Sequence, residues 1–426
     1  MRDWCFVHAA DLHLDTPFAG IHADTPEMAS LLRDASLDAL DRLVEVALER
    51  RAAFVVLAGD IYDGTERGLR AQLRLRSALE RLDAAGIATF MIHGNHDPVE
   101  EGWQAIRSWP QKVTVFGPDE VGAVPVFVDD QRVATVYGIS YPHRAVEENL
   151  ARRFRRHDED GVHVAALHCT VGPQPDHAPY APCSLDDLLA AGMDYWALGH
   201  VHRREVLHRG RHRGHPWVVY SGNTQGRSPK PSEQGPKGCY VVDVTPDAEG
   251  SPIGEPEFVA LDSVRFASVD LDVGAVADLA ELADGLQQAA QEQLTAAEGR
   301  ALVLRARLVG RSLLHGDLAH GGALDGLLQV LRDAARGSRP PLWWDRLRDA
   351  SRPVLDRDVL VDREDFTGAL VRTVDGLGED ADALAELARD ADTILRHLHP
   401  TPTAADIDEL LPQAEVRALD VLAEEN

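Results

Sequence analysis

The sequence predicts an α/β protein of two or three domains, and three observations support this fold class. Apolar strand patterns alternate with amphipathic helix patterns between residues 4 and 92, which is typical of right-handed crossovers in a largely parallel sheet. Shorter strand patterns follow up to residue 244 and indicate a second sheet. The chain has 426 residues, which is too long for one ordinary hydrophobic core.

The alternating part of the chain comes first. Strands are expected over residues 4–10, 54–58 and 87–92, and helices are expected to end near residue 51 and to cover residues 69–82. The first helix is predicted from apolar residues at three-to-four spacing, namely Leu37, Leu40, Val44 and Leu48. The third strand ends in His93-Gly94-Asn95-His96-Asp97, which places polar side chains at the open end of a sheet.

The remaining elements divide the chain into three predicted domains. Strands at 113–116, 124–128, 132–137, 163–167, 195–198, 217–220 and 239–244, with a helix at 185–190, complete a first domain of residues 1–261. Residues 246–256 are rich in Pro, Gly and acidic residues and predict a loop or linker. Strands at 267–271 and 301–308 with helices at 276–294 and 324–335 predict a small α/β accessory domain over 262–350, and residues 351–426 are helical and acidic.

Composition limits the class of protein. No apolar run approaches the length of a membrane span, and the N-terminus lacks the apolar stretch of a secretory signal, so we expect a soluble, cytoplasmic protein. Four cysteines without a Cys-x-x-Cys pair are too few for a disulfide framework and are expected to be reduced. The formal net charge of −27 argues against nucleic-acid binding, except where arginines cluster at residues 152–156 and 203–213.

Polar side chains follow five predicted strands. They are Asp11 with His13, Asp60, Asn95 with His96, His168, and His200 with His202. Because the carboxyl ends of parallel strands meet at one edge of a sheet, we expect these residues to converge. Imidazole, carboxylate and amide ligands suit Mn, Fe or Zn, and a pair of such ions can hold a hydroxide and brace phosphorus during displacement. The pattern therefore predicts phosphoester hydrolysis.

Each of these motifs alone also has a structural interpretation. Asp-x-His is uninformative, Gly-Asp after a strand is usually a turn, and His168 by itself is more often a core or turn histidine than a ligand. Asn-His-Asp can be a backbone cap. Five motifs in the right order, each at a strand end, make the joint structural interpretation improbable and favour a metal site.

The motif series resembles the calcineurin-like metallophosphoesterase superfamily. Three stretches are similar to the SbcD-type DNA repair exonucleases, and most closely to their YhaO-like branch: Val7–Asp15, Gly59–Asp63 and Tyr195–His202. The similarity continues through residues 220–227, where Ser221-Gly222-Asn223 stands in place of a Pro-Gly-Asn of some relatives without touching a proposed ligand. The resemblance implies a four-layer sandwich of two sheets flanked by helices, which would be the nuclease domain.

The resemblance also implies a role for each motif. Asp11, His13 and His202 would hold one ion, and Asn95, His168 and His200 would hold the other, with Asp60 as the bridge. A metal-bound hydroxide would attack phosphorus, His96 would protonate the leaving oxygen as general acid, and Asp97 would orient His96. We interpret the neighbouring His8, His93 and His143 as structural.

Substrate, metal and partners are likewise implied by the resemblance. It implies DNA as substrate and two divalent ions, most often Mn, with Fe, Zn or Mg as possibilities. It also implies that residues 262–350 cap the nuclease site and that the protein forms a homodimer. The C-terminal helices would dock on an SbcC-like coiled-coil ATPase. DNA backbone contacts are expected from the arginine clusters, at Arg152, Arg153, Arg155, Arg156, Arg203 and Arg204. Such a charge run can equally be a solvated face.

Three alternative functions stay open at this point. The same metal core can serve a phosphodiesterase or phosphatase acting on small nucleotides or phosphoproteins. A non-catalytic scaffold could bind DNA or an ATPase without cutting, although His96 beside a full ligand set argues against it. A nuclease could also act without any ATPase partner.

Overall fold

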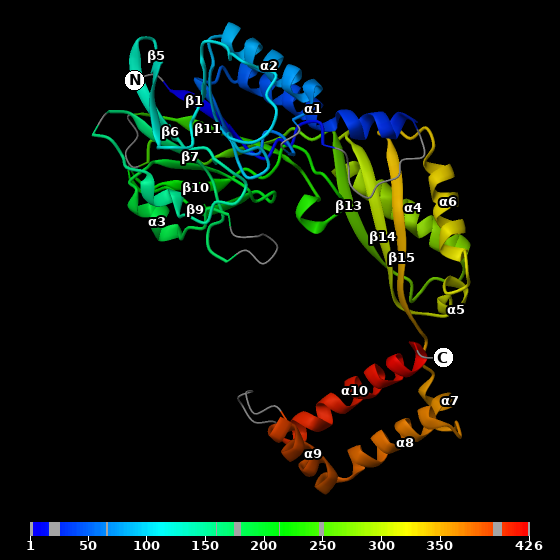
Figure 1. The fold of residues 1–426 in the computed structure, drawn as a ribbon. Coiled ribbons are helices and arrows are strands. Elements are labelled where there is room, and N and C mark those ends of the chain that lie inside the picture. The colour runs from blue at the N-terminus through cyan, green and yellow to red at the C-terminus, as the bar shows by residue number, and fades with distance from the viewer. Residues whose placement is uncertain are drawn as a thin grey trace. The chain divides into compact units, whose positions relative to one another are not determined.

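The structure is a computed structural model that describes residues 3–16, 26–64, 67–158, 160–173, 180–212, 214–246, 251–394 and 403–424 (Figure 1). The chain divides into two compact units. The first comprises residues 1–268, 290–305 and 332–345, and the second comprises residues 269–289, 306–331 and 346–426. Among the described residues, no helix is long and apolar enough to cross a membrane.

The first sheet carries the alternating part of the chain. Its six strands lie in the order β12-β11-β1-β2-β3-β4. Strands β1 to β4 run parallel to one another, and β11 pairs antiparallel with both of its neighbours, β1 and β12. The strands are β1 (Trp4–Ala9), β2 (Phe54–Ala58), β3 (Ala88–Ile92), β4 (Val113–Val115), β11 (Gly238–Val244) and β12 (Glu257–Ala260). The crossover helices are α1 (Pro26–Glu49) and α2 (Leu69–Ala84).

The second sheet also has six strands, in the order β5-β6-β7-β8-β10-β9. They are β5 (Gly122–Val128), β6 (Gln131–Gly138), β7 (Val162–His168), β8 (Tyr195–Gly199), β10 (Trp217–Tyr220) and β9 (Glu205–His208). The four central strands are parallel, and β5 and β9 pair antiparallel at the two edges. A 3₁₀ helix (Leu150–Arg153) and α3 (Leu185–Ala190) belong to this half.

Three apolar cores stack these layers. Alternate residues of β1 point to opposite faces, so Val7 packs with α1 and α2 while Phe6 packs between the two sheets. The Phe6 ring stacks on Phe54 of the neighbouring strand at 4.9 Å and meets the edge of Tyr195 from the other sheet at 5.1 Å. A third core around Trp196 lies on the outer face of the second sheet, where α3 packs. The result is a helix–sheet–sheet–helix sandwich.

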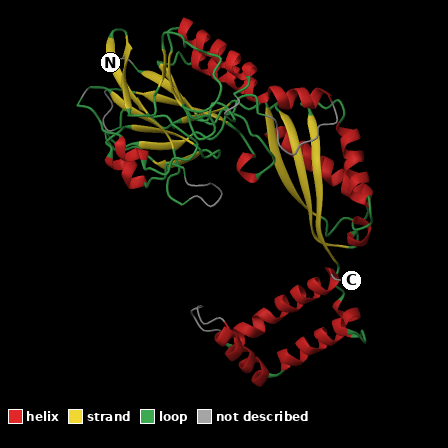
Figure 2. Ribbon diagram, in the orientation of Figure 1, coloured by secondary structure: helices red, strands yellow, loops and turns green. Residues whose placement is uncertain are grey.

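The rest of the chain contains a third sheet and a helical region. β13 (Val264–Asp272), β14 (Ala301–Ser312) and β15 (Leu342–Pro353) form the sheet in that order, with α4 (Leu279–Ala296), α5 (His315–Leu318) and α6 (Ala323–Ala335) between them in sequence. After β15 the described chain is all helix and loop (Figure 2). Its helices are α7 (Arg357–Val361), α8 (Phe366–Glu379), α9 (Ala381–Ile394) and α10 (Ala404–Glu424).

These features confirm the predicted fold class: two mixed sheets flanked by helices, followed by a smaller α/β part and a helical C-terminal region. The predicted strands and helices are found where the apolar patterns placed them, within a few residues at each end. In the third sheet, β14 is longer than expected and extends four residues past the predicted end at Leu308. The domain boundaries at 261/262 and 350/351 stay predictions.

One buried histidine between the sheets gives a prediction about acid stability. His8 on β1 is fully buried, and its Nδ1 lies 3.0 Å from the Tyr195 hydroxyl on the other sheet. Burial lowers the pKa of His8 from 6.5 to about 3. Since the unfolded chain binds this proton more readily, the contribution of His8 to stability is complete above pH 6.5 and is lost as the pH falls below that value.

We therefore expect the unfolding free energy of the unaltered chain to fall by about 2 kcal/mol between pH 7 and pH 5 because of His8. In His8→Gln this part of the decrease is expected to be absent. Urea denaturation at the two pH values measures this difference. His143→Gln is the matched control, because His143 is exposed. An unchanged pH dependence in His8→Gln would contradict the assignment.

Candidate metal centre

The predicted ligands lie in loops at the carboxyl ends of five strands. Asp11 and His13 follow β1, Asp60 follows β2, Asn95 follows β3, His168 ends β7, and His200 and His202 follow β8. The first three strands belong to one sheet and the last two to the other. The site is therefore built where two facing sheets end together, and not along the edge of a single sheet.

The first group of side chains consists of Asp11, His13 and His202, with one ligand atom from each lying within 4.8 Å of the others. The Nε2 atoms of His13 and His202 lie only 3.1 Å apart. The Asp11 carboxylate also accepts hydrogen bonds from the His200 backbone N–H at 3.0 and 3.1 Å, which ties the β1 loop to the β8 loop. This group is the set predicted for one ion.

The second group centres on Asn95. Its Oδ1 lies 3.0 Å from Nε2 of His168 and 3.2 Å from Nδ1 of His200. Asp60 stands between the two groups, because its Oδ2 is 3.3 Å from Nε2 of His168 and 3.9 Å from Nε2 of His13. The residues predicted for the second ion and the predicted bridge are thus within reach of one another.

Backbone conformation and close packing hold these residues in place. Asp11, His13, Asp60 and His200 all have positive φ, between 43° and 100°, a conformation that costs free energy in residues other than glycine and is concentrated at functional sites. Gly94 is required for space and not for a left-handed turn. A Cβ at Gly94 would lie 2.3 Å from Oδ1 of Asp60 and 2.8 Å from the His168 ring.

The outer ring nitrogens of three of the four candidate ligand histidines lie beside groups suited to orient a metal ligand. Nδ1 of His202 lies 2.7 Å from Oε1 of Glu233, Nδ1 of His13 lies 3.0 Å from Oδ1 of Asp63, and Nδ1 of His168 lies 3.0 Å from the Ala58 carbonyl. Metal-binding histidines commonly donate their second N–H to a carboxylate or carbonyl in this way, which leaves the inner nitrogen free to bind the ion. The donor set therefore fits two divalent ions.

Burial and the neighbouring carboxylates shift the pKa values of two histidines of the site in opposite directions. Burial is the main effect on His13 and lowers its pKa to about 3, so that the ring is neutral, as a ligand must be. Burial also lowers the pKa of His168, but the neighbouring Asp60 and Asp11 outweigh burial and raise it to about 9. The raised pKa of His168 thus reports the negative charge of Asp60 and Asp11, which a bound cation would neutralise.

His96 lies at the rim of the centre with a different carboxylate from the one predicted. Its side chain is 39% exposed, and its Nδ1 lies 3.2 Å from Oδ1 of Asp63. Burial lowers the pKa of His96, but Asp63 and Asp60 outweigh burial and leave it raised. The two carboxylates thus favour the protonated form of the His96 ring.

Asp97, predicted to orient His96, serves the backbone instead. Its carboxylate lies 2.9 Å from Nδ1 of His93 and accepts hydrogen bonds from the N–H groups of Gly94, Ile61 and Tyr62. Among the described contacts none joins Asp97 to the His96 ring. The structure thus corrects the predicted partner of His96 from Asp97 to Asp63, because a residue next in sequence turns its side chain into the protein.

Three functional candidates are not predicted from sequence. The first is Asp63, which could have been found from the sequence because it is the last residue of the Gly59–Asp63 stretch that carries the family resemblance. Arg227 is the second, with Nη2 at 2.5 Å from Oδ1 of Asp63. Glu233 is the third: besides His202 it contacts Asn223 Nδ2 at 2.7 Å and accepts a hydrogen bond from the Arg227 backbone N–H. No local pattern distinguishes Glu233 in its polar loop.

The arginines predicted to contact DNA all have intramolecular partners. Arg152 pairs with Asp187, Arg153 with Glu148, Arg156 with Asp194 and Arg203 with Glu205. Arg155 donates to the Arg152 and Phe154 carbonyls, and Arg204 stacks on Phe258 at 3.9 Å. Among the described contacts, none joins these arginines to the metal centre. Arg213 lies outside the described residues.

Comparison with known proteins agrees with this geometry. Residues 6–204 match the calcineurin-like phosphoesterase family, and residues 266–352 match the middle domain of metallophosphoesterase YhaO. The chain is 42% identical over 246 residues to an uncharacterized metallophosphoesterase YhaO of Bacillus subtilis, and that match covers 58% of each chain. The chain thus spans less than two thirds of this relative.

Two further relatives are more distant. A DNA double-strand break repair protein Mre11 of Halobacterium salinarum is 28% identical over 291 residues, which cover 67% of each chain. A subunit of the nuclease SbcCD of Staphylococcus saprophyticus is 25% identical over 266 residues, which cover 56% of this chain and 65% of that protein. Residues 6–204 therefore form a calcineurin-like phosphoesterase domain. The match of residues 266–352 to the middle domain of YhaO, together with the 42% identity to YhaO of Bacillus subtilis, is consistent with the YhaO-like branch.

The Glu233 contact gives a prediction about metal binding. Glu233→Gln keeps the size of the side chain but removes the charge that holds His202, so we expect the affinity for Mn to fall by about 10- to 100-fold at one of two sites. Equilibrium dialysis with elemental analysis measures the bound metal directly. Glu257→Gln, which removes an exposed partner of Arg50, is the control and is expected to leave metal binding unchanged. Equal affinities in the two variants would rule out this role for Glu233.

Proposed function

We propose that the chain is a dinuclear-metal phosphodiesterase that hydrolyses DNA. The observation that carries the proposal is the convergence of seven imidazole, carboxylate and amide ligands with His96 at their rim. Relatives named as Mre11 and as a subunit of the SbcCD nuclease support DNA as the substrate class. Mn is the metal we favour, because mixed nitrogen and oxygen ligands suit it.

In this proposal the protein side chains have separate tasks. Two bound ions would neutralise the phosphate and lower the pKa of the attacking water. His96 donates a proton to the leaving oxygen, since Asp63 holds the Nδ1 side of the ring and leaves Nε2 for the substrate. Arg227 lies beside the same carboxylate with a positive charge available to a phosphate oxygen. The left-handed backbone at Asp60 and His200 fixes the ligands before substrate binds.

A substrate comparison tests the function. Purified full-length protein with Mn is assayed on linear DNA, a cyclic nucleotide and a phosphopeptide under identical conditions. The proposal expects DNA to be cleaved with the highest kcat/KM. Preference for the cyclic nucleotide or phosphopeptide would favour the small-substrate alternative, and metal-loaded protein inactive on all three would favour a scaffold. Partner proposals, an SbcC-like ATPase and a homodimer, are tested by co-purification and by the mass of the purified protein in solution.

His96→Asn is expected to lower turnover by about 10²- to 10⁴-fold, because the general acid is removed while every proposed ligand remains. Metal content, measured on the same preparation, is expected to equal that of the unaltered chain. His143→Asn, at an exposed position, is the control. Loss of metal in His96→Asn would contradict the division between ligands and proton donor.

Asp63 gives a test of the corrected partnership. If Asp63 acts on catalysis through His96, Asp63→Asn lowers kcat in the unaltered chain but causes little further loss in the His96→Asn background. A double-mutant cycle of kcat, with metal content checked in each variant, measures the coupling. Fully additive losses would show that Asp63 acts independently of His96.

The arginine clusters give a test of DNA contact. Because each lost phosphate contact reduces the slope of log K against log salt by about 0.9, Arg203→Gln with Arg204→Gln is expected to flatten the slope by up to about two. The Arg152→Gln and Arg153→Gln pair tests the other cluster, and Arg336→Gln, just after α6, is the control. An unchanged slope in both pairs would exclude these arginines from the DNA interface.

A further inference from the structure

A cavity of about 440 Å³ has no residue proposed to bind metal among those that line it. It is lined by Arg67, His93, Val99, Gln104, Ile106, Arg107, Trp109 and Val115. These residues come from the segment before α2, the residue after β3, the segment that leads into β4, and the end of β4. All of them belong to the first compact unit.

Arg67 is an unusual side chain for the wall of a cavity. Only 4% of the residue is exposed, and its side chain ends in a positively charged guanidinium group. Its Nη2 donates to the carbonyls of Asp97 at 2.8 Å, Pro98 at 2.5 Å and Glu101 at 3.2 Å. Its Nε is buried and has no hydrogen-bond partner. No carboxylate of the described residues pairs with Arg67.

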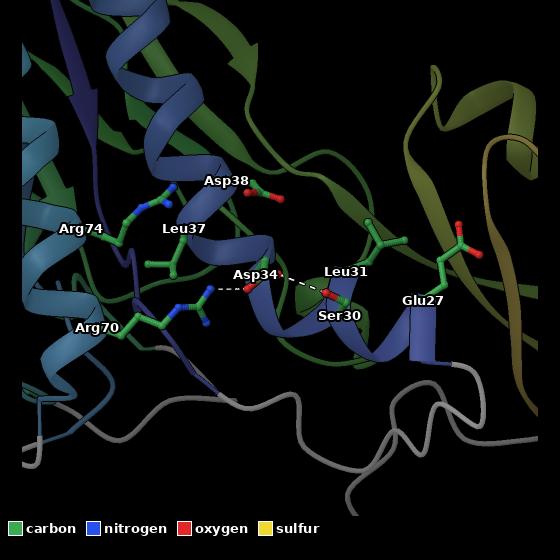
Figure 3. A pocket seen from close by; sticks show the side chains of 8 residues that line it. All are labelled: Glu27, Ser30, Leu31, Asp34, Leu37, Asp38, Arg70 and Arg74. Carbon is green, nitrogen blue, oxygen red and sulfur yellow. Dashed lines mark hydrogen bonds and ion pairs between the residues drawn. The ribbon is translucent and has the colours of Figure 1, made fainter.

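A second arginine-lined pocket of this unit shows the contrast. A cavity of about 410 Å³ beside α1 and α2 is lined by arginines and acids together (Figure 3). There Arg70 pairs with Asp34 and Asp15, and Arg74 pairs with Asp41. The positive charges in that pocket are already neutralised, so nothing about it calls for a ligand. The charge of Arg67 is not neutralised in this way.

A buried charge without a counter-ion is costly, and polar groups in protein interiors are normally satisfied. The Asp97 carboxylate does not compensate Arg67, since its oxygens are taken by His93 and by three backbone N–H groups. Arg107 is exposed at the rim and adds a second guanidinium, and Gln104 adds an amide. Apolar surface comes from Trp109, Ile106 and Val115. The cavity thus combines a positive end with an apolar wall.

We propose that this cavity binds a small oxyanion, a phosphate- or carboxylate-bearing molecule, with the anionic group on Arg67 and Arg107. Guanidinium groups recognise both oxyanions through paired, charge-assisted hydrogen bonds. The Trp109 ring offers a surface on which a planar group of the ligand can pack. The site is separate from the metal centre, and the proposal does not depend on the proposed function.

The position of the cavity gives the site a mechanical consequence. His93 forms part of its wall, and the same imidazole contacts Asp97, which holds the backbone of Gly94, Ile61 and Tyr62. These loops carry His96 on one side and Asp60 on the other. A ligand in the cavity therefore contacts the residues that fix the two catalytic loops from behind.

Isothermal titration of the full-length, metal-free chain tests the proposal. Removing the metal prevents phosphate from binding at the dinuclear centre. Inorganic phosphate, AMP and malonate are titrated separately. The proposal expects at least one of them to bind once per chain. Tighter binding of AMP than of phosphate would identify a ligand with a planar group, and binding of malonate alone would identify a carboxylate ligand.

Variants locate the binding. Arg107→Gln, at the exposed rim, is expected to weaken the binding about tenfold or more without affecting folding. Arg76→Gln, which removes an exposed arginine of α2 paired with Glu80, is the matched control and is expected to bind normally. Arg67→Lys is a second variant that keeps the buried charge but loses the guanidinium geometry. The absence of binding to all three probes, or equal affinity in Arg107→Gln and Arg76→Gln, would overturn the proposal.

Discussion

The structure depends on bringing the carboxyl ends of strands from two sheets to one place. Imidazoles and carboxylates that are nearly all buried face one another there, with two histidine Nε2 atoms only 3.1 Å apart. Such a cluster is unfavourable by itself, since buried charges must be paired and hydrogen-bonded. The inter-sheet core around Phe6, Phe54 and Tyr195 opposes this cost by fixing the distance between the sheets. Cations bound between the carboxylates would complete the compensation.

The outer contacts show how the cluster is kept in one arrangement. Asp63 serves two histidines, because it lies beside both His13 and His96. Glu233 connects His202 to the backbone of Arg227, and Asp97 connects the loops after β2 and β3. Removing any of these carboxylates would leave the imidazole or backbone N–H groups that it now contacts without a hydrogen-bond partner. The ligands are thus positioned by a layer of acidic residues, which also contributes to the acidity of the chain.

Much of the fold, and the convergence of the candidate ligands, can be predicted from the sequence, for a physical reason. Buried parallel strands are continuous apolar runs, so their ends are visible, and ligands such as Asp60 and His168 stand directly at those ends. The direction in which a side chain points inside a loop has no such signal. For that reason the family resemblance implies that Asp97 pairs with His96, although Asp97 turns inward to His93. The sequence also gives no sign of Glu233, which lies 31 residues after His202. The acidic partners of the arginines cannot be predicted from the sequence either, because folding brings them together from distant positions in the chain.

The most direct test of the central claim is anomalous diffraction from crystals of the chain grown with Mn. We predict two manganese ions per chain, one among Asp11, His13 and His202 and the other among Asn95, His168 and His200, with Asp60 between them. Manganese at a different place, or a single ion that leaves one of these groups without metal, would contradict it.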